Sequence, residues 1–159
     1  GPFSTYIRYR YETINGRPLS QDTLGIFNIP NFYLMGLATP GREYMSPRGY
    51  NDHRLGTRAF MATFEFRAPV IPINVLEAVK IVKLGMPTFA FITDIGNAWQ
   101  PSRKTENMII TNGIEFRFSI NIDNIPIFIF SYGLAQEIKD WDKGTQPNPY
   151  LQLTLINPF

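Results

Sequence analysis

Apolar and polar side chains alternate along six segments of the chain, and this period of two constrains the fold more than any other feature. Such alternation is typical of β-strands that have one apolar and one polar face. In the first segment, for example, Ile7, Tyr9 and Tyr11 share a face, opposite arginines and a glutamate. The predicted strands are Ser4–Ile14, Arg58–Val70, Pro87–Trp99, Met108–Ile120, Pro126–Ala135 and Tyr150–Phe159. The pattern therefore predicts an all-β fold with antiparallel strands.

Composition excludes several classes of function. A chain of 159 residues with a net charge of +2 forms one domain or part of one, and its basic residues do not cluster as nucleic-acid binding requires. It contains no cysteine and a single histidine, His53, which removes thiol chemistry, disulfides and the usual zinc sites. We expect no metal, no cofactor and no catalytic residue. No apolar run approaches the ~20 residues of a membrane helix.

The distribution of phenylalanine favours a membrane barrel over a soluble one. Each predicted strand has about ten residues, the length that crosses a bilayer when tilted. Nearly every apolar face carries phenylalanine, while the opposite faces carry charged or small residues at mid-strand. Phenylalanine outside and polar groups inside is the pattern of a transmembrane β-barrel. A soluble sandwich or lipocalin-like barrel shows the same alternation with its apolar face inward, and it stays open as an alternative.

Two connections carry more than turn residues. Asn74–Leu84 changes to helical spacing, with Asn74 as a capping residue and Gly85 able to close the end. This predicts one short helix, and a continuous hairpin is the alternative.

The long connection Asn15–Thr57 includes the apolar stretch Ile26–Leu37, which would aggregate in water. We therefore expect it to pack against the rest of the protein.

Two lone acids, Glu65 and Asp94, lie at matching depth in successive strands. If these strands pair around a symmetric insert, opposed residue numbers sum to 159, which places the two carboxylates opposite each other. Such a pair repels unless a cation lies between them or one acid is protonated. Arg48, in the long connection, has a planar fork suited to carboxylates, with Gly49 and Tyr50 completing the turn. Alternatives are Arg67 as a separate partner, a different register, or a glycosidase carboxylate pair.

The segment from Arg48 to Phe159 resembles the C-terminal half of the transmembrane barrel of the BamA-like outer-membrane assembly family, the bacterial surface antigen type. The order and spacing of several motifs carry this resemblance. They are Pro47-Arg48-Gly49-Tyr50, Thr63-Phe64-Glu65-Phe66, Thr93-Asp94-Ile95-Gly96-Asn97-Ala98-Trp99, Gly113-Ile114-Glu115-Phe116, Ile127 to Ala135, and Leu151 to the terminal Phe159. The resemblance implies an extracellular loop, about 15–57, whose arginine is held inside the barrel by Glu65 and Asp94. It also implies that these are the last six strands of a sixteen-stranded barrel, with the helix in a periplasmic turn.

The resemblance further implies a location and partners. It places the protein in the outer membrane of a Gram-negative bacterium or a related organelle membrane. There it would help insert or fold β-barrel proteins without covalent catalysis, in contact with the lipid bilayer, client proteins, accessory lipoproteins and the remaining barrel strands. Alternatives are a secretion translocator of the same family, a small complete membrane barrel, or a soluble binding module.

Six strands cannot close a barrel around a folded-in loop, so we expect an open sheet with two bare edges. Unpaired backbone groups at such an edge are untenable in lipid. The first and last strands should therefore meet further strands, from an N-terminal part or another chain, and should not pair with each other. The final strand should pair weakly at its end, because Pro158 cannot donate a hydrogen bond.

Overall fold

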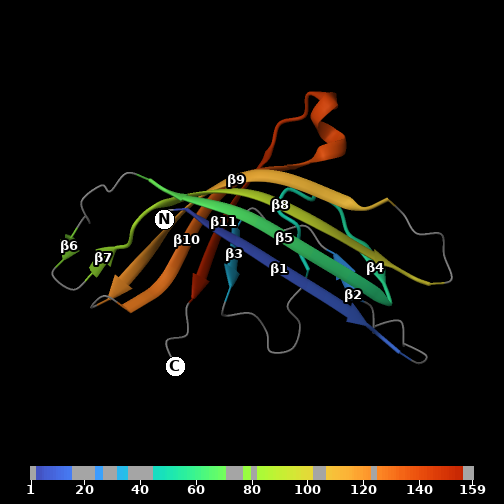
Figure 1. Ribbon diagram of the computed structural model, residues 1–159, viewed down its shortest axis with the longest axis horizontal. Helices are drawn as coiled ribbons and strands as arrows, with labels where there is room; N and C mark the ends of the chain where they lie inside the picture. Colours follow the sequence, from blue (N-terminus) through green and yellow to red (C-terminus); the bar gives the residue numbers. More distant parts are fainter. Residues whose placement is uncertain are drawn as a thin grey trace.

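A computed structural model (Figure 1) describes residues 3–15, 24–26, 32–35, 45–70, 77–79, 82–101, 107–122 and 125–155. Most of these residues are in strands. The long strands are β1 (Ser4–Thr13), β5 (Arg58–Pro69), β8 (Thr88–Trp99), β9 (Ile109–Ile122), β10 (Ile125–Glu137) and β11 (Asn148–Leu155). The short ones are β2 (Leu24–Ile26), β3 (Phe32–Met35), β4 (Arg54–Gly56), β6 (Glu77–Val79) and β7 (Val82–Leu84), and a 3-10 helix, η1 (Ile138–Lys143), precedes β11.

The six long strands form one antiparallel sheet in the order β1-β5-β8-β9-β10-β11, which confirms the all-β prediction. The sheet curves strongly across its width (Figure 1). In the described part of the chain β1 and β11 lie at different ends of this order and do not pair. The expectation of two bare edges is wrong at β11, because its outer edge pairs in parallel with β3 through Leu151–Thr154, which no sequence pattern predicted.

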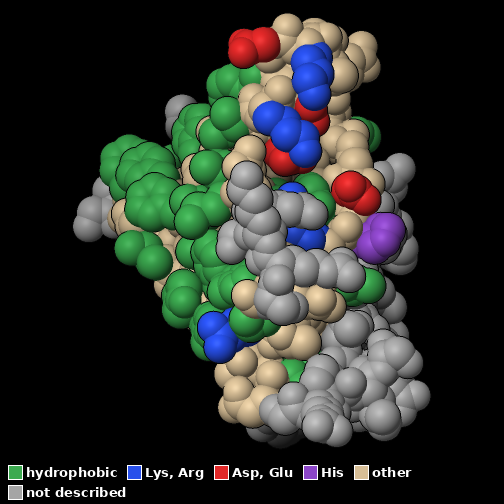
Figure 2. Space-filling view, turned by 90° about the vertical axis from the view of Figure 1, so that its right-hand side faces the viewer, with side chains coloured by type: hydrophobic (Ala, Val, Ile, Leu, Met, Phe, Trp, Pro, Cys, Tyr) green, Lys and Arg blue, Asp and Glu red, His purple; other side chains and the backbone are tan. Residues whose placement is uncertain are grey.

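In the middle of β5 and β8, large apolar side chains on one face are exposed and acidic side chains on the other face are buried. Phe64 and Phe91 are 47 % and 60 % exposed on the convex face, while Glu65 and Asp94 on the concave face are 3 % and 0 % exposed. Figure 2 shows the hydrophobic side chains gathered on one side of the molecule. Among the described residues, no helix has the length and apolarity needed to span a membrane.

The predicted helix in Asn74–Leu84 is wrong for the described residues of that segment. β6 and β7 pair with each other as a hairpin, and Val82–Leu84 of β7 also pairs with the far end of β9. The β-branched residues that suggested a helical stripe are better suited to strands, and pairing with β9 supplies backbone hydrogen bonds that an isolated short helix would lack.

The predicted register between β5 and β8 is also wrong, by two residues. Glu65 lies opposite Ile92, and Asp94 lies opposite Thr63, so opposed numbers sum to 157 rather than 159. The insert is not symmetric about the strand pair, because the β6–β7 hairpin pairs Glu77 with Lys83 around a different centre. A shift of two preserves the face of every side chain, so both acids still point to the concave side.

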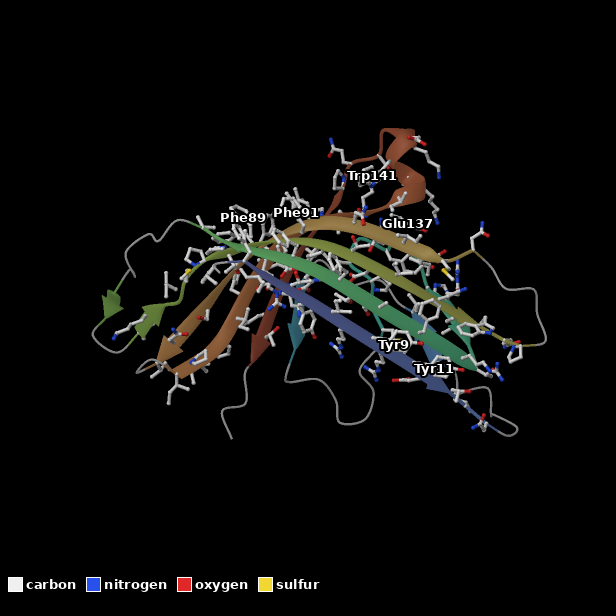
Figure 3. The ribbon with its side chains drawn as sticks, viewed as in Figure 1. Tyr9, Tyr11, Phe89, Phe91, Glu137 and Trp141 are labelled. Atoms are coloured by element: carbon white, nitrogen blue, oxygen red, sulfur yellow. The ribbon has the colours of Figure 1, made fainter. Side chains whose placement is uncertain are left out.

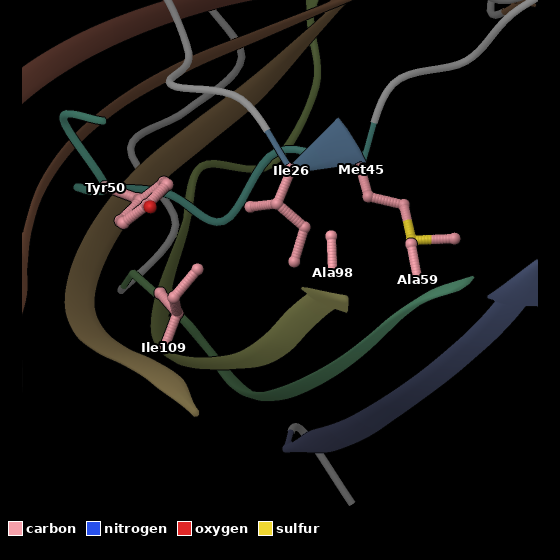
Figure 4. Packing of buried hydrophobic residues seen from close by; sticks show 6 residues of the cluster. All are labelled: Ile26, Met45, Tyr50, Ala59, Ala98 and Ile109. Carbon is pink, nitrogen blue, oxygen red and sulfur yellow. The ribbon is translucent and has the colours of Figure 1, made fainter. Parts of the chain in front are cut away.

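Described residues of the long connection before β5 pack onto the concave side of the sheet at one end, whereas residues 27–31 and 36–37 of the predicted apolar stretch Ile26–Leu37 lie outside the described residues. β2 pairs with β4, and Ile26 is fully buried. The core cluster combines side chains from this connection with others from the sheet (Figure 4). Its members are Ile26, Met45, Tyr50, Ala59, Ala98 and Ile109. The connection therefore supplies much of the apolar core that the sheet encloses.

Candidate functional site

The site begins at a tight turn formed by Pro47, Arg48, Gly49 and Tyr50. The Tyr50 amide donates to the Pro47 carbonyl at 3.3 Å, and Gly49 has a φ of 79°, which favours glycine. A Cβ at Gly49 would lie 2.4 Å from the Ala135 carbonyl carbon of β10. The turn thus lies directly against the sheet, and Tyr50, 3 % exposed, anchors it in the core cluster.

Arg48 binds the two acids that the sequence singles out. Its Nε and Nη2 donate to the two carboxylate oxygens of Asp94, each at 2.8 Å, and its Nη1 donates to Glu65 Oε1 at 2.8 Å. The Arg48 backbone amide also donates to Asp94 Oδ2 at 3.0 Å. Burial alone lowers the pKa of Arg48, but the Asp94 carboxylate outweighs it and holds this pKa well above its ordinary value. Arg48 is therefore a fixed, bidentate cation.

A third acid, Glu115 of β9, belongs to the site although the sequence did not assign it there. Its Oε2 lies 3.5 Å from Arg48 Nη1 and accepts a 2.6 Å hydrogen bond from the Tyr150 hydroxyl of β11. Arg117 pairs with Glu115 and donates to both Glu65 oxygens at 2.9 Å. The alternation of Glu115 and Arg117 signalled only a polar face, and the register of several strands was needed to place them beside Arg48.

Arg67, which the sequence offered as a separate partner for one acid, joins the same cluster. It donates to Glu65 Oε2 at 2.9 and 2.7 Å, while Thr63 donates to Asp94 Oδ1 at 2.8 Å. We call the resulting set the ion cluster: Arg48, Arg67 and Arg117 with Glu65, Asp94 and Glu115. Three arginines face three carboxylates, so each charge in the cluster has an opposite charge beside it.

Gly96 of β8, the remaining glycine of the Thr93–Trp99 motif, does not contact the ion cluster. A Cβ there would meet Ile26 Cδ1 at 2.8 Å, so the absence of a side chain makes room for the long connection. Phe159, expected to end the closing strand, lies outside the described residues. The Asn148 side chain donates to the Gly49 carbonyl at 3.3 Å, which ties the turn to the start of β11.

The ion cluster holds the turn at Pro47–Tyr50 against the strands that carry its acids. Of the buried side-chain polar atoms in the described residues, only Asn121 Oδ1 lacks a hydrogen-bond partner, so the buried polar atoms of the cluster are all satisfied. No group of His, Cys, Asp or Glu in the described ranges is arranged to hold a metal ion. The ion cluster thus fixes the position of the turn at Pro47–Tyr50 relative to the sheet.

We expect Tyr150→Phe to destabilise the fold by about 1.5–3 kcal/mol, because it removes a hydrogen bond to a buried carboxylate. Tyr132→Phe is the matched control, since Tyr132 is 46 % exposed on the convex face and its change should cost little. The measurement is the free energy of unfolding in urea for both variants. Equal effects would show that the hydrogen bond to Glu115 contributes nothing.

Comparison with known proteins identifies no relative: no family model, no curated protein and no solved structure matches this chain.

Proposed function

We propose that this chain forms the C-terminal part of an outer-membrane β-barrel of the BamA-like assembly type, which helps insert or fold β-barrel proteins without covalent catalysis. The observation that carries the proposal is the inverted burial of the sheet. Charged side chains are enclosed on the concave face, and large apolar side chains cover the convex one. Lipid solvates such a convex face and water does not.

Partly or largely exposed aromatic side chains contact one another across β8, β9 and β10. Phe89 contacts Phe116, Phe116 contacts Phe118, and Phe118 contacts Phe130, with ring centroids 5.3, 6.0 and 4.9 Å apart. Monomeric soluble proteins rarely expose a contiguous apolar patch of this kind. This argues against the soluble binding module, whose apolar face would point inward.

The concave face supports the barrel part of the proposal. A cleft of about 640 Å³ lies along it, lined by polar and charged side chains of all six long strands and by apolar ones such as Met45, Met61 and Ile129. The ion cluster holds the turn at Pro47–Tyr50 at one side of this cleft. In a barrel closed by further strands, this arrangement would fix the long connection inside the lumen. The ion cluster supports the assembly function because Arg48, Glu65 and Asp94 lie in the motifs that resemble those of the BamA-like family.

The face assignment predicts which positions contact lipid. Spin labels on single cysteines at Phe64, Phe116 and Phe130 should report lipid, and labels at Arg117 and Ser131 should report the lumen. The chain has no cysteine, so each label is unique. An arginine in place of Phe64 should cost ~2–4 kcal/mol if that residue faces the middle of the bilayer. Lipid exposure of the Arg117 or Ser131 label would contradict the assignment.

The assembly function is tested by client folding. The protein is reconstituted in lipid vesicles, and the folding rate of an unrelated, unfolded β-barrel protein is followed. We expect faster folding than in empty vesicles, and a smaller acceleration with Arg48→Ala. If correctly inserted protein leaves the client's rate unchanged, the assembly function is refuted. Passage of a protein into the vesicle lumen would favour the secretion translocator instead.

A further inference from the structure

The turn between β10 and β11 exposes a tryptophan although its backbone is firmly held. η1 has no buried residue, and Trp141 and Ile138 are 57 % and 42 % exposed. Yet Gln136 Nε2 donates to the Thr145 carbonyl and hydroxyl at 3.1 and 2.8 Å, and that hydroxyl donates to the Asp140 carbonyl at 2.9 Å. An ordered turn that presents an indole outward has the form of a contact surface.

The sequence of η1 divides its surface into one apolar edge and two charged edges. A 3-10 helix has three residues per turn, so residues three apart eclipse one another. Ile138 and Trp141 therefore share an edge. The other two edges each combine a lysine with an aspartate: Lys139 with Asp142, and Asp140 with Lys143. The lysine side chains are 60 % and 61 % exposed, and their ammonium groups pair with Glu137 and Asp140 at 2.8 and 2.7 Å.

The convex face carries tyrosine both toward the end that holds η1 and nearer its middle, where Tyr132 is level with Phe116 and Phe89. Tyr9 and Tyr11, 66 % and 46 % exposed, lie toward that end on β1, whereas Phe89 and Phe91 lie farther from it on β8. Figure 3 shows Trp141 on the side of the sheet from which Phe89 and Phe91 project. Tyrosine and tryptophan side chains prefer the boundary between hydrocarbon and water, because each combines an apolar ring with a polar group. Phenylalanine has no polar group and lacks this preference.

We propose that the Ile138–Trp141 edge of η1 is a membrane anchor that inserts at the level of the lipid headgroups. The occupant is the bilayer surface, because the apolar edge continues a face already proposed to contact lipid. This inference rests on the proposed membrane location. It adds that the bilayer surface lies at the height of η1.

The test uses fluorescence quenching by brominated phosphatidylcholine. Trp99→Phe leaves Trp141 as the sole tryptophan of the full chain, since the chain has two. A companion variant with Trp99→Phe, Trp141→Phe and Phe89→Trp reports on the convex face. In vesicles with bromines placed either near the carbonyls or near the chain ends, Trp141 should be quenched most by the shallow bromines, with a blue-shifted emission. The tryptophan at position 89 should be quenched more by the deep ones.

The outcomes separate the anchor from the membrane location. If the tryptophan at position 89 is quenched and Trp141 is not, the anchor is refuted while the membrane location stands, and the η1 edge takes another partner. If Trp141 is quenched most by the deep bromines, η1 lies in the hydrocarbon and the headgroup position is refuted. If neither is quenched in either lipid, the proposed function itself fails.

Discussion

Arg48→Ala should destabilise the fold by about 3–5 kcal/mol, because it leaves buried carboxylates without their cation. Asp94 would lose both charge-assisted hydrogen bonds from the guanidinium, and Glu65 would lose one. Arg48→Lys keeps the charge but cannot bind Asp94 with two parallel donors, so its effect should be intermediate. The measurement is the urea concentration at the midpoint of unfolding from vesicles.

Two further variants make this result specific to the ion cluster. Asp94→Asn combined with Arg48→Ala should recover part of the lost stability, since it removes one uncompensated charge. Arg10→Ala is the matched control, because the Arg10–Glu12 pair is about a third exposed and such pairs contribute only ~0–1 kcal/mol. An unfolding midpoint for Arg48→Ala equal to that of Arg10→Ala would show that Arg48 and its ion cluster do not stabilise the fold.

Gly49→Ala should prevent the turn from docking, with a loss well above that of an ordinary strained glycine site. The left-handed conformation alone costs about 1–2 kcal/mol for a residue with a side chain. The added methyl group would also lie 2.4–2.6 Å from backbone atoms of Ala135 and Gln136, which belong to β10 and cannot rotate away.

Gly144→Ala separates the two contributions. Gly144 also has a positive φ, 66°, but nothing lies within 4 Å of a Cβ built there. Its substitution should therefore show the conformational cost alone. Unfolding free energies of the two variants, measured together, give the cost of the steric clash by difference. Similar values for both would mean that the turn docks more loosely on β10 than its geometry indicates.

Strands and faces could be read from the sequence because they depend on a local period. Alternation places Glu65 and Asp94 on one face whatever the register, which is why an error of two residues left the Arg48 contact predictable. The register itself depends on the β6–β7 hairpin, whose β-branched residues imitated a helical stripe. The alternation within a strand does not reveal how many residues the following turn occupies, and this number sets the register of the strand pair.

Other features depend on contacts between distant parts of the chain. The place of Glu115 beside Arg48 follows from the pairings of β5, β8 and β9 together, so no single strand reveals it. The hydrogen bond from Tyr150 requires β11 as well. The parallel pairing of β3 with β11 joins a short segment of the long connection to the last strand, and nothing in the alternation of either segment signals it.

The spacing of the ion cluster along the chain dictates the order of folding. Arg48 contacts acids that lie 17, 46 and 67 residues later, and Glu115 receives its last hydrogen bond from a residue 35 positions farther on. The turn therefore cannot make all of these contacts until the chain has been synthesised as far as Tyr150. Closing loops of this size before any contact forms is entropically costly, so docking of the turn should be a late and slow step.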